Sequence, residues 1–185
     1  MGGLAMKFMI ASDIHGSAHF CRLLIDAYNR ENADRLIILG DILYHGPRND
    51  LPEEYAPKKV IEMLNAIKDE LLCVRGNCDT EVDQMVLEFP IMGEYMIIPV
   101  GKNIIYATHG HIRNKNNMPP LKKGDVLLHG HTHIPTLDEE NGIYIINPGS
   151  VSIPKNGSQN GYMIFENNTF TLKNLDGEEI AKREI

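Results

Sequence analysis

The stretch KFMIASDIH, residues 7–15, decides the fold. It is a short apolar run that ends at Asp13, and Gly16 follows as a turn residue. Beyond the turn, Ser17 is a candidate helix N-cap, and apolar residues recur at helical spacing at Phe20, Leu23, Leu24, Ala27 and Tyr28. The stretch therefore predicts a buried strand, a loop and an amphipathic helix.

The same pattern occurs again along the first half of the chain. A second apolar run, residues 36–39, stops at Gly40-Asp41, and a polar loop leads to a second helical pattern over residues 60–67. A third run, residues 71–74, ends at Arg75-Gly76-Asn77-Cys78-Asp79. Continuous apolar runs that alternate with helices predict a buried, at least partly parallel sheet. In such sheets ligands gather at the carboxyl ends of the strands.

The second half of the chain changes to short strands joined by turns. We expect strands at residues 96–100, 103–107, 126–128, 143–146, 162–165 and 169–172. No internal repeat or linker divides the sequence, so residues 1–185 predict one domain. Residues 1–5 are interpreted as an alternative start or a remnant of cloning.

Composition and charge exclude several classes of function. Eighteen basic against 25 acidic residues give a net charge of -7, whereas nucleic-acid polymers and anionic membranes select an excess of Lys and Arg. No apolar segment reaches the roughly 18 residues that span a bilayer. The three cysteines, Cys21, Cys73 and Cys78, do not form a disulfide framework, which favours the cytoplasm. An isologous dimer formed through an exposed strand edge would be common for such a chain, so a homo-oligomer is possible, but nothing in the sequence specifies one.

Potential metal ligands follow five of the predicted strands, and each group lies beside a glycine. The groups are Asp13 with His15, Gly40-Asp41, Asn77, Thr108-His109-Gly110-His111 and Gly130-His131-Thr132-His133. If the sheet brings them together, two carboxylates, an amide and at least four imidazoles face one point. Such a group is unfavourable unless divalent cations compensate the charge.

The mixture of ligand atoms indicates which metals and how many. Oxygen and imidazole donors without evident thiolates suit Mn²⁺, Fe or Zn²⁺ rather than a closed structural zinc site. The donors are too many for one ion. Two metals about 4 Å apart, bridged by one carboxylate, would account for them, and this geometry is used to attack phosphate esters.

These motifs, taken in order, resemble the signature of the calcineurin-like metallophosphoesterases. The resemblance extends to Asn147-Pro148-Gly149-Ser150-Val151-Ser152 and so covers most of the chain. The Asn-Pro-Gly-Ser segment, the small size and residues 44–49 are most similar to the YfcE-type bacterial phosphodiesterases. The resemblance implies an α/β fold, a four-layer α/β/β/α sandwich of two facing mixed sheets flanked by helices.

The resemblance also implies a function and a set of ligands. It implies a phosphodiesterase that hydrolyses a small phosphodiester with a hydroxide held between two divalent metals, Mn²⁺ first, with Zn²⁺, Fe or Ni²⁺ as alternatives. Asp41, Asn77 and His109 would act in catalysis by positioning metal and phosphate. The first metal is assigned Asp13, His15 and His133, the second Asn77, His109 and His131, and Asp41 bridges both. His129 lies outside the motif, and we expect it in the core or behind the ligands.

Cys78 is a departure from the family pattern. Many members have a histidine after the asparagine ligand, where it is thought to protonate the leaving group, and a neutral thiol is a poor replacement. We therefore expect a substrate with a good leaving group, although a small side chain without a catalytic part is an equal alternative. His111, Arg48 and His45 are further candidates near the site, each balanced against an ordinary loop or surface role.

Two other functions compete with this hypothesis. The first is a non-catalytic protein-binding scaffold, because the small subunit of the retromer complex resembles the same family. Intact ligand positions argue against it, and Cys78 leaves it open. The second is a binuclear hydrolase of the metallo-β-lactamase kind, but the His-x-His-x-Asp-His run of that family is missing, since Thr132-His133-Ile134 stands at the corresponding place.

Overall fold

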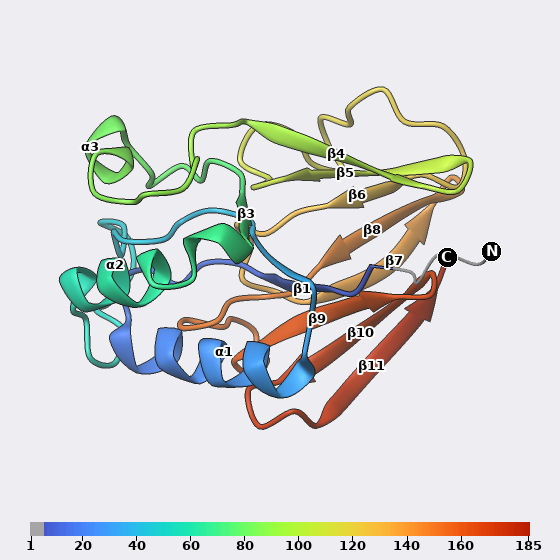
Figure 1. Cartoon of the computed structure of the whole chain (residues 1–185). Coiled ribbons are helices and arrows are strands. Elements are labelled where there is room, and N and C mark those ends of the chain that lie inside the picture. Colours follow the sequence, from blue (N-terminus) through green and yellow to red (C-terminus); the bar gives the residue numbers. More distant parts are fainter. Residues whose placement is uncertain (1–5) are drawn as a thin grey trace.

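The computed structural model describes residues 6–185. Two mixed β-sheets pack face to face (Figure 1). The first sheet has the order β11-β10-β9-β1-β2-β3 and the second β4-β5-β6-β8-β7. The strands are β1 Phe8–Ala11, β2 Arg35–Ile38, β3 Leu71–Cys73, β4 Tyr95–Val100, β5 Asn103–Thr108, β6 Val126–Leu128, β7 Thr136–Glu140, β8 Ile143–Asn147, β9 Gly161–Glu166, β10 Thr169–Asn174 and β11 Glu179–Glu184. The α-helices are α1 Ala18–Glu31, α2 Pro57–Asn65 and α3 Glu81–Gln84, with a 3₁₀ turn at Lys68–Glu70. The remnant expected at residues 1–5 lies outside the described residues.

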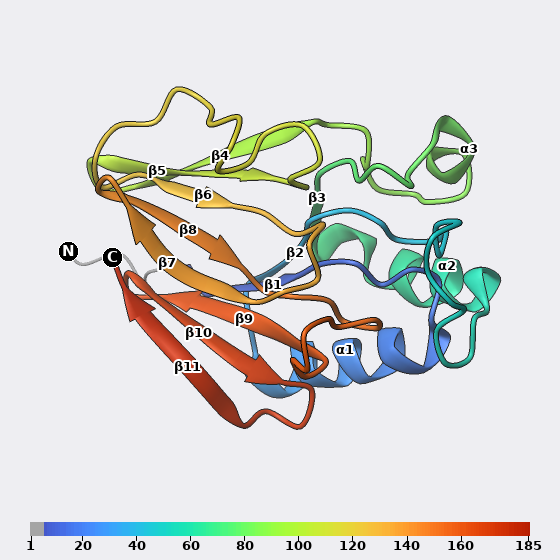
Figure 2. The same ribbon diagram turned by 180° about the vertical axis from the view of Figure 1, so that it is seen from behind.

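Each sheet contains a group of three parallel strands. These are β1, β2 and β3 in the first sheet and β5, β6 and β8 in the second. Parallel strands end on the same side, so the loops that follow them collect at one end of the sandwich. Figures 1 and 2 show the C-terminus at the opposite end. Of the helices in residues 6–185, none is long and apolar enough to cross a membrane.

The continuous apolar runs are buried on both faces. In β1, Met9 and Ala11 pack in the core beneath α1 and α2, whereas Phe8 and Ile10 belong to the core between the two sheets. A strand with helices on one side and a second sheet on the other has no solvent-facing side. This is why β1 and β2 lack an alternating polar pattern, whereas Leu72 on the edge strand β3 is exposed.

The predicted start of α1 is confirmed. The Ser17 hydroxyl accepts a hydrogen bond from the backbone N–H of Phe20 at 3.2 Å, and Leu24 and Ala27 are fully buried on the sheet side. The helix ends at Asn32, whose backbone adopts the left-handed conformation with φ 49°. An N-cap and a left-handed C-cap satisfy backbone groups that the helix leaves unpaired.

The sandwich predicted from the sequence is confirmed, and its helices are unevenly distributed. Helices α1 and α2 cover the outer face of the first sheet (Figure 1). The outer face of the second sheet is approached instead by the loop of residues 109–125, which contains no helix. The open loop leaves the strand ends of the second sheet accessible from outside.

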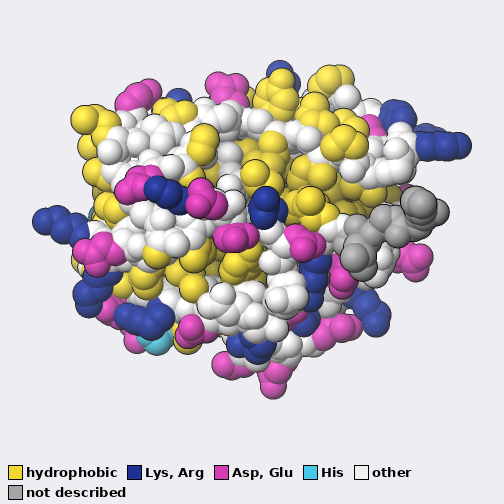
Figure 3. Space-filling model, viewed as in Figure 1, with side chains coloured by type: hydrophobic (Ala, Val, Ile, Leu, Met, Phe, Trp, Pro, Cys, Tyr) yellow, Lys and Arg dark blue, Asp and Glu magenta, His cyan; other side chains and the backbone are white. Residues whose placement is uncertain are grey.

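Strands β7 and β11 were not predicted. Their sequences, TLDEE and EIAKRE, are rich in charge because both are edge strands, and charged side chains protect an exposed edge from pairing with other chains. Arg183 on β11 donates from Nε and Nη2 to the carbonyl of Leu137 on β7, at 3.2 and 3.1 Å, and joins the two edges. At the other edge of the second sheet, hydrophobic side chains gather over β4 (Figure 3), where Tyr95 and Ile97 are exposed.

A buried carboxylate ties α1 to the first sheet. The Glu31 side chain is only 9% exposed and accepts from Lys173 Nζ at 2.7 Å and from the Tyr162 hydroxyl at 2.8 Å. Burial alone would raise the pKa of Glu31, but the hydrogen bonds from Lys173 and Tyr162 outweigh it and hold the pKa below its ordinary value. The ionised form of this carboxylate therefore stabilises the fold.

We predict that Glu31→Ala lowers the free energy of unfolding by about 2 kcal/mol, because it leaves Lys173 and Tyr162 without their partner. Denaturant unfolding at neutral pH measures the change, and Asp26→Ala, an exposed position on the same helix, is the control. The folded pKa is depressed, so this stabilisation is present above the unfolded pKa of about 4.3 and is lost as pH falls through the folded value. Equal stability of the two variants at neutral pH would contradict the prediction.

Candidate metal centre

The predicted ligands meet at the carboxyl ends of five parallel strands. Asp13 and His15 follow β1, Asp41 follows β2, Asn77 follows β3, His109 follows β5, and His131 and His133 follow β6. Residues more than a hundred positions apart in the sequence therefore lie side by side. The sheet topology, rather than any local motif, creates the cluster.

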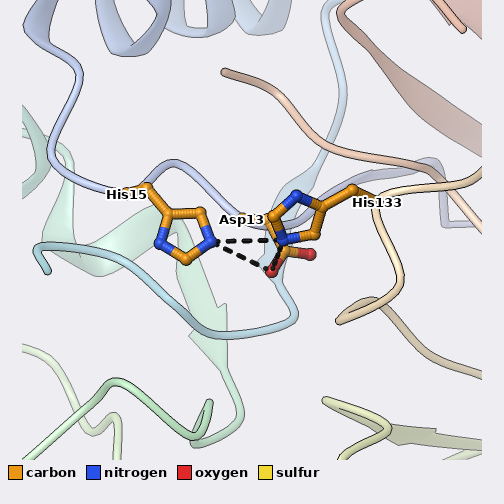
Figure 4. A group of neighbouring side chains, drawn as sticks. All are labelled: Asp13, His15 and His133. Carbon is orange, nitrogen blue, oxygen red and sulfur yellow. Dashed lines mark hydrogen bonds and ion pairs between the residues drawn. The ribbon is translucent and has the colours of Figure 1, made fainter. Parts of the chain in front are cut away.

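One group consists of Asp13, His15 and His133, whose side chains point toward one another (Figure 4). Asp13 Oδ1 lies 3.1 Å from His133 Nε2 and 3.5 Å from His15 Nε2, and the two imidazole nitrogens are 3.3 Å apart. All three residues are buried. Three ligand atoms at such distances can hold one metal ion.

A second group consists of Asp41, His109 and His131. His109 Nε2 lies 3.5 Å from Asp41 Oδ2 and 3.1 Å from His131 Nδ1. The amide oxygen of Asn77 is 3.0 Å from the same His109 nitrogen, so it adds a fourth donor.

Asp41 lies between the two groups and faces histidines of both. Its Oδ2 atom lies 3.6 Å from His15 Nε2 and 3.5 Å from His109 Nε2. Its other oxygen, Oδ1, accepts a hydrogen bond from the backbone N–H of Cys78 at 2.8 Å, which orients the carboxylate. One oxygen is thus held by the protein, and the other faces both groups of imidazoles.

Backbone carbonyls select the inward-facing lone pairs of three imidazoles. The Nδ1 atoms of His15, His109 and His133 lie 2.7, 2.7 and 2.8 Å from the carbonyls of Tyr44, Leu39 and Ile153. A ring that donates from Nδ1 to a carbonyl presents a free lone pair at Nε2, which is the usual arrangement behind a histidine that binds metal. The lone pairs converge where a cation is needed.

A buried oxygen without a partner fits the same conclusion. Asp13 is fully buried, and its Oδ2 accepts from the Ser12 hydroxyl at 2.6 Å and from the backbone N–H of His131 at 3.0 Å. Its Oδ1, which faces His15 and His133, has no hydrogen bond. An orphaned carboxylate oxygen costs free energy unless a cation binds it, so the residues present fit a metal site.

The electrostatics of the protein alone show how much positive charge the cluster requires. Burial would lower the pKa of His109, yet the hydrogen bond to Asp41 and the charge of Asp13 raise it to about 9. Burial also lowers the pKa of His131, and the nearby His109 adds to the effect and brings it to about 4. The raised pKa of His109 and the lowered pKa of His131 show that the carboxylates favour positive charge on one imidazole but not on its neighbour as well. A divalent cation can supply positive charge in place of a proton, because metal binding releases protons from its ligands.

The backbone of the cluster is strained. Asp13, His15, Asp41, His131 and His133 have φ values of 60°, 49°, 55°, 67° and 60°, in the left-handed region that residues other than glycine seldom adopt, although Asp and His adopt it more often than most. Strain of this kind persists only where surrounding contacts enforce it, and it gathers at functional sites. Five of the seven expected ligands are held in this way.

Asp79 and the segment after β8 supply part of the enforcement. The buried Asp79 carboxylate accepts from the backbone N–H groups of Asp41, Ile42 and Gly76, at 2.8, 2.9 and 2.7 Å. Ser150 and Ser152 donate to the carbonyl of Asp13 at 2.8 and 3.1 Å. These bonds join the loop after β3 to the loop after β2, and the loop after β1 to the segment after β8.

Asn147 supports the histidine loop after β6. Its amide nitrogen donates to the carbonyl of Gly130 at 2.9 Å and to the Thr132 hydroxyl at 3.0 Å. Asn147 thus ties the segment after β8 to the loop that carries His131 and His133. Asp79 was noticed only as part of a motif, because nothing in the sequence shows that three backbone N–H groups surround it.

The remaining candidate residues divide into two sets. Cys78 and Arg48 line the cleft of about 380 Å³ over the cluster, together with His15, His131 and His133. Burial raises the pKa of the Cys78 thiol, which is therefore neutral.

His45, His111 and His129 do not line this cleft. The His45 ring packs edge to face against Tyr44 and Tyr55, and the exposed His111 lies 5.4 Å from His109, ring to ring, outside the cluster. His129 is buried, with 7% of its surface exposed, and its Nδ1 lies 3.0 Å from the Gly130 carbonyl. It lines a separate groove of about 770 Å³ over the second sheet.

Two cleft residues were missed by the sequence analysis. Thr132 and Lys155 line the cleft, and no ion pair involves Lys155 or Arg48 within residues 6–185. Thr132 stands inside the histidine motif, which could have suggested it. Lys155 follows the Asn147–Ser152 segment, and only the hydrogen bond from its backbone N–H to the carbonyl of His133 brings it to the site.

A fold with this centre is that of a metal-dependent phosphoesterase, and comparisons with known proteins agree. The chain belongs to the calcineurin-like phosphoesterase superfamily, whose domain model matches residues 6–169. It is similar to the phosphodiesterase YfcE of Escherichia coli strain K12, with 45% identity over 175 residues that cover 95% of each chain. The predicted family and its YfcE-type resemblance are confirmed.

Solved structures give the same result. A structure of the E. coli phosphoesterase YfcE aligns with a TM-score of 0.94 and covers 97% of this chain and 100% of its own. Vacuolar protein sorting 29 of Cryptosporidium parvum aligns with a TM-score of 0.62 at 18% identity, covering 99% of each chain, and shares the fold alone.

We predict that Gly130→Ala lowers metal content and thermal stability together. A Cβ atom at Gly130 would lie 1.9 Å from Ser12 Oγ and 2.9 Å from Asp13 Oδ2, so it would push the histidine loop away from β1, at about 1–3 kcal/mol. Elemental analysis and thermal unfolding measure the two effects. Gly93→Ala, whose Cβ meets nothing closer than 3.9 Å, is the control. A Gly130→Ala variant with full metal content and unchanged stability would show that the close contact is unimportant.

Proposed function

We propose that the chain is a binuclear metal-dependent phosphodiesterase. The observation that carries the proposal is that one carboxylate oxygen, Asp41 Oδ2, lies within 3.6 Å of a histidine nitrogen from each of two groups of candidate ligands. Asp13, His15 and His133 would hold one ion, Asn77, His109 and His131 the other, and Asp41 both. Divalent ions bound there would neutralise phosphate charge and lower the pKa of a water molecule to supply the nucleophile.

The residues of the chain position the substrate and the ions. Arg48 and Lys155, on the wall of the cleft, can donate N–H groups to phosphate oxygens that do not face the metals. The backbone carbonyls behind His15, His109 and His133 keep those rings oriented before substrate binds. Asp41, Asn77 and His109 would act by holding metal and phosphate in place. As metal ligands, their side chains would not be available for proton transfer.

The preference for a diester rests on the relatives. The E. coli relative is named a phosphodiesterase, and this chain shares the whole fold with it. We further propose Mn²⁺ as the metal, with Zn²⁺, Fe or Ni²⁺ as alternatives, because the donors are imidazole, carboxylate and amide. We also propose a cytoplasmic location for a single-domain enzyme, in keeping with three free cysteines.

A protein-binding scaffold is the second candidate. The likeness to vacuolar protein sorting 29 supports it, at 18% identity, which extends to the fold alone. Against it stands the supported geometry of the cluster, because a scaffold has no need of strained ligands with oriented lone pairs. The two candidates differ in whether bound metal produces turnover.

We predict that chelator-stripped protein regains hydrolysis of bis-p-nitrophenyl phosphate when Mn²⁺ is restored, and that it hydrolyses p-nitrophenyl phosphate more slowly. Asp41→Asn should lower the diester rate by about 100-fold or more, because an amide cannot share charge between two ions. The absorbance of the released p-nitrophenolate measures the rate for each ester. Asp138→Asn, a change of an exposed carboxylate on β7, is the control. Two bound metals without turnover would favour the scaffold.

We predict that Cys78→His raises turnover of diesters with poor leaving groups by about tenfold, because an imidazolium can protonate the departing oxygen where a neutral thiol cannot. The gain should shrink for p-nitrophenyl esters, whose leaving group needs little protonation. Rates across a series of leaving groups measure the slope. Unchanged or lower rates across the whole series would remove residue 78 from the mechanism.

A further inference from the structure

An apolar cavity of about 370 Å³ opens beside the metal cleft. Its walls include Tyr44, Tyr55, Ile61, Val82 and Val86. Cys78 lines both this cavity and the cleft, so the two spaces adjoin at this residue. A substrate bound at the metals can therefore extend past Cys78 into an apolar space.

The apolar side chains of the cavity are exposed to a degree that the core does not explain. Val82 is 68% exposed, and Tyr44 and Val86 are each 42% exposed. Figure 3 shows hydrophobic side chains along the left edge of the molecule, between α3 and α2. Single exposed apolar residues are common, but several around one cavity next to a reactive site indicate a ligand with apolar surface.

Both walls of the cavity are held in place. On one side, Asp83 accepts from the backbone N–H and the hydroxyl of Thr80, at 2.7 and 2.9 Å, and this capping box fixes the start of α3. On the other side, the His45 ring lies between the rings of Tyr44 and Tyr55, with centroids 4.8 and 5.2 Å away. A helix of four residues without any buried residue needs such a cap to keep Val82 in position.

The cavity is also coupled to the metal ligands. The carbonyl of Tyr44 accepts the hydrogen bond from His15 Nδ1 at 2.7 Å, so the residue that forms one wall also orients a ligand. The cations Arg48 and Lys155 line the cleft and not the cavity, and Asp83 is the one charged residue lining the cavity, with its carboxylate already engaged by Thr80. Charge in the cleft and apolar surface in the cavity match the two parts of an ester: the phosphate and an uncharged organic group.

We propose that this cavity is the subsite for the leaving group of the substrate, and that this group is aromatic. The inference rests on the proposed function. Residue 78 occupies the place where related enzymes are expected to protonate the leaving oxygen, so the space beyond Cys78 receives that arm of the diester. Water adds to phosphorus, the P–O bond to the aromatic arm breaks, and the arm departs as a phenolate that takes its proton from solvent. A phenolate leaves without the help of a general acid, so an apolar subsite with no proton donor is sufficient for such a group.

The test uses Val82→Asn, because a side chain that is 68% exposed can change without unfolding the protein. We expect kcat/KM for bis-p-nitrophenyl phosphate and for methyl p-nitrophenyl phosphate to fall together, each by about tenfold and mainly through KM, since lost apolar contact weakens binding of the shared leaving group. Val82→Leu should keep or raise both values. Ile180→Asn, a 44% exposed position on β11 away from the cleft, is the matched control.

Each outcome decides between distinct possibilities. A fall for bis-p-nitrophenyl phosphate alone would overturn the assignment, because the cavity would then hold the arm that stays on phosphorus. Unchanged values for both substrates would overturn the subsite itself. Wild-type protein that binds metal and hydrolyses neither ester would instead refute the proposed function, and this result is separable because it does not involve the variants.

Discussion

The structure depends on two carboxylates that are buried among imidazoles. Asp13 and Asp41 each have one oxygen held by protein hydrogen bonds and the other turned toward histidine nitrogens. Removing such charges from water is costly, and the arrangement is stable only if positive charge occupies the space between them. Both carboxylates lie at one end of the sandwich, where the carboxyl ends of the six parallel strands are found. The core, the loops and the cleft can all be understood from this requirement.

The protein stabilises the cluster from behind rather than from within. Backbone carbonyls orient three imidazoles, Asp79 collects three backbone N–H groups, and serines after β8 hold the loop of Asp13. Five of the expected ligands adopt the left-handed conformation, and the supporting hydrogen bonds hold them in it. A cluster built this way is oriented for its ions before they bind.

The surroundings of the cluster are divided by chemistry. The cleft carries Arg48 and Lys155 above the ligands, while the space beyond Cys78 is apolar. This division matches the two parts of a phosphate ester, because the phosphate is anionic and the organic groups are not. The chain has an overall charge of -7, and two of its 18 basic residues, Arg48 and Lys155, line the cleft. The residues that differ in character between the two spaces are therefore not among the expected metal ligands.

The sequence by itself determined the order of the elements and the ligand set. The first three strands, the helix that begins after Ser17 and the short strands of the second half were readable, because an apolar run or a helical period reflects neighbours along the chain. The ligands were readable only as five ordered groups and through their resemblance to a family. The edge strands β7 and β11 were not, since their charged residues satisfy solvent rather than a core. The roles of Asp79 and Lys155, the left-handed backbone at five ligands and the apolar cavity beyond Cys78 were decided by tertiary structure alone. Each depends on contacts between loops from different strands, and local sequence carries no information about which loop will face which.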